Sequence, residues 1–175
     1  MDRDDIIKRQ SELEALRLPE EKLWRETAEL IRPEEADFAG PKSPRGYDEV
    51  FDSSPIYAAD DFVGGLFGQA SSPAIDWFGF GVPDESLMDW QPVKLWFHQV
   101  TTITKASLSP NASTFYTSIA PVYGDVGCFG LGTQHQEEDV GRQRIIDRCI
   151  PLKEMFIDLD AFGDLDTCLL YTSRR

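Results

Sequence analysis

The apolar positions of the first thirty residues recur at spacings of three, four and seven, which is typical of a helix with one buried face. Two stripes follow one another along this segment: Ile6, Leu13 and Leu16, and then Leu23, Trp24, Ala28 and Ile31. Pro19 falls between the stripes, and proline is tolerated in the first turn of a helix. The pattern predicts two helices, or one kinked helix, ending before Pro33.

Residues 33–54 hold three of the eleven prolines and no helical stripe, which predicts an ordered loop or linker. Asp52, Ser53 or Ser54 can cap the helix that follows, and Pro55 suits its first position. This second helix is predicted over 55–70. Its apolar side consists of Ile56, Ala59, Phe62, Val63, Leu66 and Ala70.

The 55–70 helix also contains Gly64, Gly65 and Gly68. Each glycine in a helix interior costs about 1 kcal/mol relative to alanine. Without Cβ atoms, one side of the helix would be flat, and another backbone could approach it closely. Two interpretations remain open: a tight helix crossing inside one domain, or a contact between neighbouring subunits.

Two further helices follow an aromatic stretch in which Trp77, Phe78 and Phe80 are expected to be strand or core residues. Pro92 opens the first helix, and Ser109-Pro110-Asn111 is predicted to end it and to cap the second. The stripe of the first is Val93, Trp96, Phe97, Val100, Ile103 and Leu108. The second carries Phe115, Ile119, Val122 and Tyr123, with a bend at Pro121.

The period changes after this helix. Short runs of mixed apolar and polar residues cover 142–152, 154–160 and 164–172, with turn signals between them. They predict an antiparallel meander. Helices followed by strands indicate an α+β fold, with N-terminal helices and then a small antiparallel β-meander.

The formal net charge is −14, from 31 acidic and 17 basic residues. This charge argues against a plain nucleic-acid-binding module, which would show a basic face. Arg142, Arg144 and Arg148 are local basic spots that could touch DNA or a partner, although a solvated strand face explains them equally well. The N-terminus is charged and no apolar run approaches the roughly 20 residues of a membrane span, which favours a cytoplasmic protein.

The sequence shows no catalytic, cofactor or metal site. Cys128, Cys149 and Cys168 form no CxxC pair, and neither His98 nor His135 has metal-ligand spacing. No phosphate-loop Gly-Lys-Ser/Thr occurs, and the glycines of 124–132 do not follow a strand and open a helix as a nucleotide fingerprint requires. The triplet Asn111-Ala112-Ser113 matches a glycosylation signal, interpreted as chance in a chain with no signal peptide.

Acidic residues are the remaining candidates for chemistry. Glu137-Glu138-Asp139 and the pair Asp158 and Asp160 could in principle supply two carboxylates at the separation used by glycosidases. Solvated loop acids are the favoured interpretation. An acidic α+β hydrolase with paired carboxylates, and an acidic adaptor or scaffold protein that binds a basic partner, are the alternatives to the function below.

One stretch, "FDSSPIYAADDFVGGLFGQASSPAIDWFGF", resembles the hallmark of the head-to-tail connector, or portal, proteins of short-tailed bacteriophages. The matching positions are Asp52, Ser53, Ala58, Ala59, Gly65, Leu66, Gly68, Ser72, Pro73, Ala74, Trp77 and Phe78. The family's opening helix is matched by Leu23, Trp24, Ala28, Ile31, Pro33 and Phe38. "PVKLWFHQVT", "NASTFYTSIAPVYGDVGCFGLGT" and "EMFIDLDAFGDLDT" resemble later family segments, so that the likeness spans about residues 20–167. The chain departs from the family at Phe62-Val63-Gly64 and in the short, polar stretch 133–152.

The resemblance implies a structural virion protein, not an enzyme, without cofactors. It implies the wing-like N-terminal region of a subunit in a dodecameric ring, assembled in the host cytoplasm and placed at one capsid vertex. Such a ring docks the terminase motor, passes double-stranded DNA in and out without tight binding, and joins tail or adaptor proteins. Residues 1–175 are then one incomplete region, because the family continues into clip, stem and C-terminal segments. Residues 168–175 break the family pattern after Thr167 and are expected not to belong to the native fold.

Overall fold

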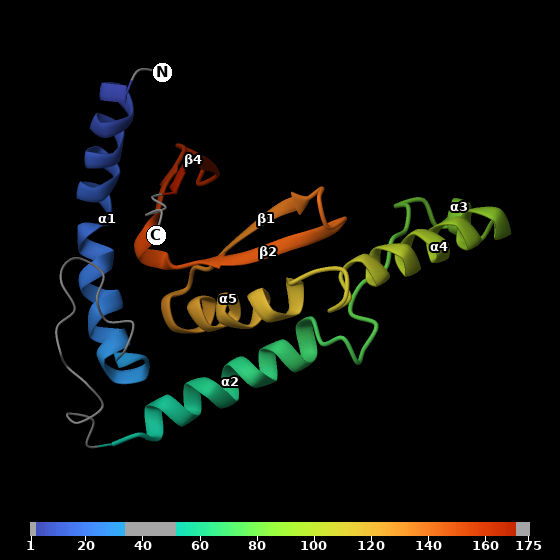
Figure 1. Ribbon diagram of the computed structural model, residues 1–175, viewed down its shortest axis with the longest axis horizontal. Helices are drawn as coiled ribbons and strands as arrows, with labels where there is room; N and C mark the ends of the chain where they lie inside the picture. Colours follow the sequence, from blue (N-terminus) through green and yellow to red (C-terminus); the bar gives the residue numbers. More distant parts are fainter. Residues whose placement is uncertain (1–2, 34–51, 171–175) are drawn as a thin grey trace. The chain divides into compact units, whose positions relative to one another are not determined.

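The computed structural model describes residues 3–33 and 52–170. Its elements are α1 (Arg3–Ile31), α2 (Ser54–Ala70), α3 (Glu85–Met88), α4 (Gln91–Ser107), α5 (Phe115–Phe129), β1 (Thr133–Asp139), β2 (Arg144–Ile150), the 3-10 turn η3 (Leu152–Glu154), β3 (Met155–Leu159) and β4 (Leu165–Leu170). Figure 1 shows this order of helices followed by short strands, which confirms the α+β class. Most of the predicted linker 33–54 lies outside the described residues. The family position Phe38 also lies outside them.

The chain forms two compact units. The first unit comprises Met1–Asp61, Gly124–Thr133 and Ile150–Arg175, and the second comprises Phe62–Tyr123 and Gln134–Cys149. Helices α2 and α5 each begin in one unit and end in the other. None of the helices described here is both long and apolar enough to cross a membrane.

The first unit is organised around α1, which is a single helix with Pro19 inside it. Leu13 and Ala28 are buried residues of α1, at 1% and 0% exposure, and the helix contacts β3. Ala28 joins Leu152 and Met155 in a buried apolar cluster. The partly buried side chains packed against this cluster are Trp24, Phe129, Leu131, Ile157 and Leu170.

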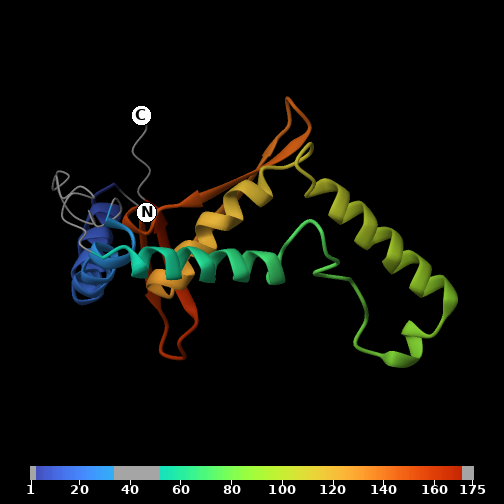
Figure 2. The ribbon, with the colours of Figure 1, turned by 90° about the horizontal axis from the view of Figure 1, so that it is seen from below.

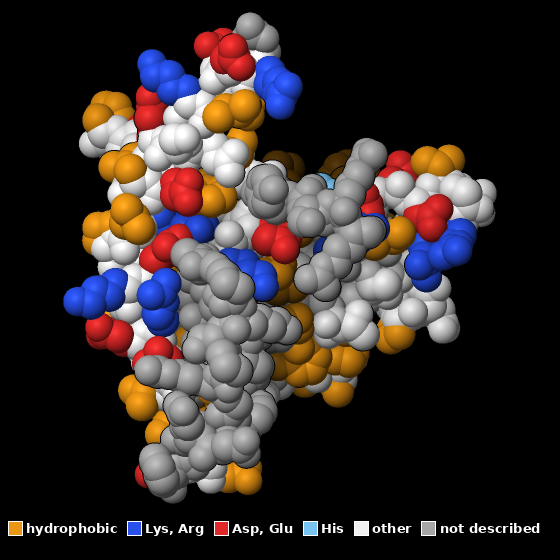
Figure 3. All heavy atoms as spheres, turned by 60° about the vertical axis from the view of Figure 1, so that its left-hand side comes forward, with side chains coloured by type: hydrophobic (Ala, Val, Ile, Leu, Met, Phe, Trp, Pro, Cys, Tyr) orange, Lys and Arg blue, Asp and Glu red, His pale blue; other side chains and the backbone are white. Residues whose placement is uncertain are grey.

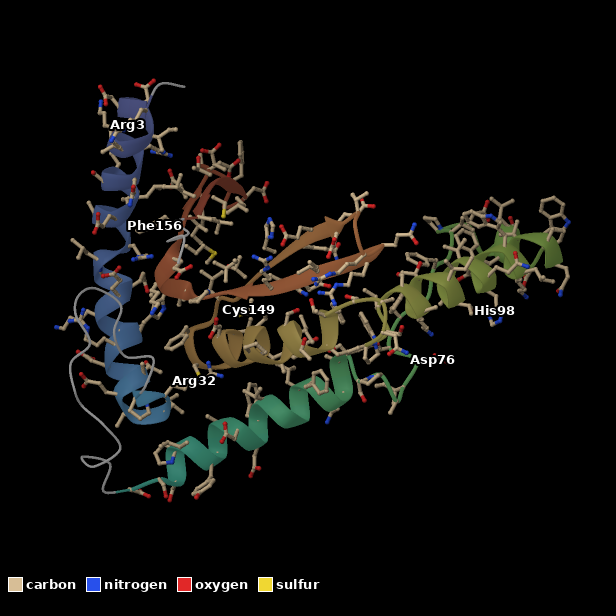
Figure 4. The ribbon with its side chains drawn as sticks, in the orientation of Figure 1. Arg3, Arg32, Asp76, His98, Cys149 and Phe156 are labelled. Atoms are coloured by element: carbon tan, nitrogen blue, oxygen red, sulfur yellow. The ribbon has the colours of Figure 1, made fainter. Side chains whose placement is uncertain are left out.

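Arg17 fastens α1 to the turn before β3. Its guanidinium Nε and Nη2 lie 2.7 and 2.5 Å from Oε1 of Glu21, and its Nη1 donates to the carbonyl oxygen of Met155 at 2.7 Å. The same guanidinium covers the ring of Phe156, at 3.9 Å from the ring centroid. Figure 4 shows Phe156 on the strand beside α1. A planar guanidinium can satisfy a carboxylate, a carbonyl and an aromatic face together, so this one side chain fixes the docking of helix and strand.

The predicted meander consists of two separate two-stranded sheets, β1-β2 and β3-β4. Pro151 and η3 stand between β2 and β3, and because proline has no N–H to donate, the chain leaves the ladder there. In the β3-β4 hairpin Met155 pairs with Leu170, Phe156 with Leu169 and Ile157 with Cys168. Residues 168–170 are therefore part of a strand, while 171–175 lie outside the described residues.

The helix predictions are confirmed over most of their length, with local corrections. The chain from Trp77 to Phe80 is not a strand, and Trp77 instead stacks on Phe115 with ring centroids 5.8 Å apart. The backbone N–H of Phe115 donates to the Oγ of Ser113 at 2.9 Å, so Ser113, not Ser109-Pro110-Asn111, caps α5. The short helix α3, capped by the Asp84 side chain, has no counterpart in the sequence prediction because one turn is too short to show a period.

Candidate functional site

The helices α2, α3 and α4 contain no buried residue. Large apolar side chains on and beside them are more than 45% exposed: Tyr57, Phe62, Leu87, Trp90, Leu95, Trp96 and Ile103. A helix with a good apolar stripe normally buries that stripe against another element. These helices are therefore the candidate assembly surface of the chain.

The glycine side of α2 is open. Within the described residues of the second unit, no heavy atom beyond the neighbouring backbone of α2 itself lies within 4 Å of the Cβ positions that side chains would occupy at Gly64, Gly65 or Gly68. Helical periodicity places Tyr57 and Asp61 on the same side as these glycines. The glycines therefore do not serve a tight helix crossing inside this unit, which favours the interpretation that they meet another chain.

Capping side chains fix where α2 begins. An Asp52 carboxylate oxygen accepts a hydrogen bond from the backbone N–H of Ser54 at 2.9 Å. This backbone bond, helped by the Ser54 side chain, lowers the pKa of Asp52. The predicted capping segment 52–54 is confirmed, with Asp52 as the residue whose side chain bonds the helix start.

A few polar contacts hold α4 to the segment before it. The Lys105 ammonium lies 2.6 Å from an Asp76 carboxylate oxygen, and this hydrogen bond lowers the pKa of Asp76. The Phe80 backbone N–H donates to the Thr101 hydroxyl at 3.1 Å. Because the Asp76 side chain is 90% exposed, this ion pair contributes little stability. The outward side of α4, with Trp96 and Ile103 at 57% and 69% exposure, is left uncovered.

A buried carboxylate joins α5 to the β1-β2 hairpin. Asp147 is 4% exposed, and its Oδ2 accepts from the Ser113 hydroxyl at 2.7 Å. Its Oδ1 accepts from the side-chain amides of Gln134 at 3.1 Å and Gln136 at 2.9 Å. The Ser113 hydroxyl oxygen also accepts the first N–H of α5. The carboxylate is thus satisfied by neutral donors next to a helix N-terminus, and its role is structural.

The loop before α5 runs along the outer edge of β2. The Ile145 N–H donates to the Ala112 carbonyl at 3.0 Å, and the Thr114 N–H donates to the Ile145 carbonyl at 3.4 Å. The Thr114 hydroxyl donates to the Asp147 carbonyl and accepts from the Asp147 N–H. The family segment at 111–115 is therefore held by backbone and side-chain hydrogen bonds to β2, which periodicity does not reveal.

The acidic residues considered for catalysis have local partners. On β1, a Glu137 oxygen lies 2.6 Å from Arg148, and an Asp139 oxygen lies 3.8 Å from Arg144. Consecutive strand residues point to opposite faces, so Glu137 and Glu138 do not form a convergent pair. In the first unit Asp158 binds Arg9 at 2.6 Å, while an Asp160 oxygen accepts two backbone N–H groups of its own turn.

Other chemistry-bearing residues do not come together. Figure 4 shows His98 on α4 and Cys149 on β2, well apart within the second unit. Cys168 is an exposed thiol, whereas Cys128 and Cys149 are half-buried. Among the described residues, no group of three or more His, Cys, Asp or Glu side chains is placed to hold a metal ion. A groove of about 640 Å³ is lined by residues of the hairpin and of the loop after α4, including Glu137, Glu138 and Arg144.

The comparisons with known proteins agree with one another. The family described as "Bacteriophage head to tail connecting protein" matches residues 3–174. A curated relative named "Portal protein", from Salmonella phage epsilon15, is 25% identical over 171 residues. The alignment covers 96% of this chain and 30% of the relative, so the chain spans less than a third of that protein's length. The resemblance seen in the sequence is confirmed.

Proposed function

The chain belongs to the family of bacteriophage head to tail connecting proteins, and from that premise we propose that it is the wing-like N-terminal region of a portal subunit. The observation that carries this proposal is the family match over residues 3–174. In this role the chain builds structure at the capsid vertex, is not an enzyme and needs no cofactor. Copies of the subunit form a ring, for which the expected number is twelve.

The exposed helices support a role in assembly. A chain that functioned alone would gain stability by covering the apolar side chains of α2 and α4, yet no residue of either helix is buried. Contacts with neighbouring subunits, or with the capsid, tail and terminase proteins of the particle, would cover them. Neither alternative function has an observation of its own. The candidate acids Glu137, Asp139 and Asp158 are in ion pairs, and Asp160 accepts hydrogen bonds within its own turn. Acidic and basic side chains are interspersed on the face in Figure 3.

The charge supports a channel wall that lets DNA pass without holding it. A protein that grips duplex DNA places unpaired Lys and Arg on the phosphates. Arg142, Arg144 and Arg148 instead lie within 4 Å of carboxylates on their own hairpin. Together with a net charge of −14, this pairing leaves the hairpin little attraction for DNA. Packaging and ejection through the ring would therefore meet no tight binding here.

Ring formation by the full-length protein tests the function. We expect electron micrographs of the purified full-length subunit to show closed rings with a central channel. A subunit that remains monomeric over the micromolar range, or that forms closed dimers, contradicts the proposal. A gel-shift titration of this chain at two salt concentrations tests the passive role toward DNA, and tight, salt-sensitive binding would contradict it.

A further inference from the structure

The turn of the β3-β4 hairpin carries an exposed aromatic side chain. Phe162 is 91% exposed, and the flanking Leu159 and Leu165 are 55% and 62% exposed. Figure 2 shows the hairpin, in red, extending away from α1 within the first unit. Exposed leucines also occur on α1, and scattered exposed apolar residues are ordinary. Three apolar residues at the end of one hairpin are not explained by the packing of the unit.

The backbone of the turn is closed by hydrogen bonds although its apolar side chains are mostly exposed. One Asp160 carboxylate oxygen accepts from the backbone N–H of Phe162 at 2.8 Å and of Asp164 at 2.9 Å. The backbone closes the turn with an Asp160 N–H to Asp164 carbonyl bond of 2.8 Å, and Gly163 supplies the positive φ of 87° that the turn requires. The backbone that carries Phe162 is therefore held in one conformation before any partner arrives. Such preorganisation lowers the entropy cost of binding.

The surroundings of Phe162 are negatively charged. Asp160, Asp164 and Asp166 all lie in or beside the turn and are exposed. Among the described residues, no Lys or Arg forms an ion pair with any of the three, whereas Asp158 further down the strand is paired with Arg9. The end of the hairpin thus combines the exposed Phe162 side chain with three aspartates that form no ion pair among the described residues. DNA and anionic membrane surfaces would be repelled by it.

We propose that this hairpin tip docks into an apolar pocket rimmed by lysine or arginine on a different protein. Phe162 fills the pocket, the two flanking leucines exclude water around it, and the aspartates meet the basic rim. Charge complementarity selects this occupant over a second copy of the chain, which carries −14. A buried aromatic anchor with a charged rim is the usual arrangement of a binding hot spot. The proposal does not depend on ring formation.

Selection from a displayed library of random peptides tests the chemistry of the partner. Peptides are selected on this chain and counter-selected on its Phe162→Ala variant. We expect the survivors to combine Leu, Ile or Trp with Lys or Arg, to lose about tenfold or more in affinity for Phe162→Ala, and to bind more weakly at high salt. The Asp164→Asn, Asp166→Asn double variant should flatten the salt dependence. Val140→Ala, which changes a 74% exposed apolar residue at the tip of the other hairpin, is the matched control and should bind like the parent.

Folding does not confuse this test, because Phe162 buries almost no surface and its variant should melt at the parent temperature. Failure to find peptides that depend on Phe162 overturns the proposal, and so do dependent peptides without cationic residues. Self-association of the parent chain in sedimentation velocity, lost in Phe162→Ala, would assign the tip to a second copy and also overturn it. The full-length Phe162→Ala subunit should still form rings. Failure of the docking proposal is therefore distinguishable from failure of the proposed function, which ring formation tests.

Discussion

Helix α1 and the helices of the α2 to α4 segment all carry apolar side chains, but they differ in how completely these side chains are buried. Helix α1 buries Leu13 and Ala28, packs Ala28 with Leu152 and Met155, and is fastened to β3 by Arg17. Helices α2 and α4 have comparable stripes, yet none of their residues is buried. The first region therefore draws its stability from within the chain. The second is folded as helices whose apolar stripes are at most half-buried within the chain.

The largest effect is expected where the first region is most completely buried. Leu13→Ala removes a side chain that is 1% exposed, and the lost burial and the cavity together should lower the free energy of unfolding by about 2–5 kcal/mol. Leu16→Ala, one turn away on the same helix and 61% exposed, should change it by less than about 0.5 kcal/mol. Urea unfolding followed by circular dichroism measures both. Equal losses in the two variants would remove the distinction between the faces of α1.

Truncation after Thr167 tests whether the last strand belongs to the first region. The sequence predicts that residues 168–175 are not native, whereas the structure pairs 168–170 with β3 and packs Leu170 against the buried cluster. Because of this pairing, the truncated chain should lose about 2–3 kcal/mol, from ladder hydrogen bonds of about 0.5–1.5 kcal/mol each and from the exposed cluster. Thermal melting of the truncated and the parent chain distinguishes these two expectations. An unchanged melting temperature would support the prediction that residues 168–175 are not native.

Asp147 is a buried, hydrogen-bonded residue of the second unit, whose helices α3 and α4 have no buried residue. Asp147→Ala leaves the donors of Ser113, Gln134 and Gln136 without their acceptor and should cost about 1–3 kcal/mol. Asp147→Asn keeps an acceptor oxygen and should cost less. Glu138→Ala, an exposed acid on β1, is the control and should be nearly neutral. Circular dichroism during urea unfolding measures these variants. If Asp147→Ala loses no more stability than the control, the Asp147 hydrogen bonds are not needed for the fold.

The periodicity of the chain was sufficient to predict the four long helices, because their stripes are regular even where they are only half-buried. Strand β1 could not be found in this way, since its seven residues, TQHQEED, contain no apolar side chain to alternate. Helix α5 continues through Gly124, where the Arg32 guanidinium occupies the space that a Cβ would need. That contact joins residues 92 positions apart, as the Asp147 network joins 113, 134 and 147, and sequence spacing gives no signal for either.

The smallest effect on folding, and the sharpest test of the second region, is expected at Gly65. Because no described atom of its unit beyond the neighbouring backbone of α2 itself lies within 4 Å of the position of a Cβ there, Gly65→Ala should stabilise the chain by about 0.5–1 kcal/mol, through the higher helix propensity of alanine. Gly65→Leu should also leave the melting temperature unchanged or slightly higher. In the full-length protein, however, the leucine would hold a neighbouring backbone away from α2, and ring formation should fall while Gly65→Ala is tolerated better. A lower melting temperature for both variants would mean that the glycines serve the fold itself. Normal rings from Gly65→Leu would show that the open side of α2 meets no other subunit, and the exposed surface of this region would then have to be covered by a different partner.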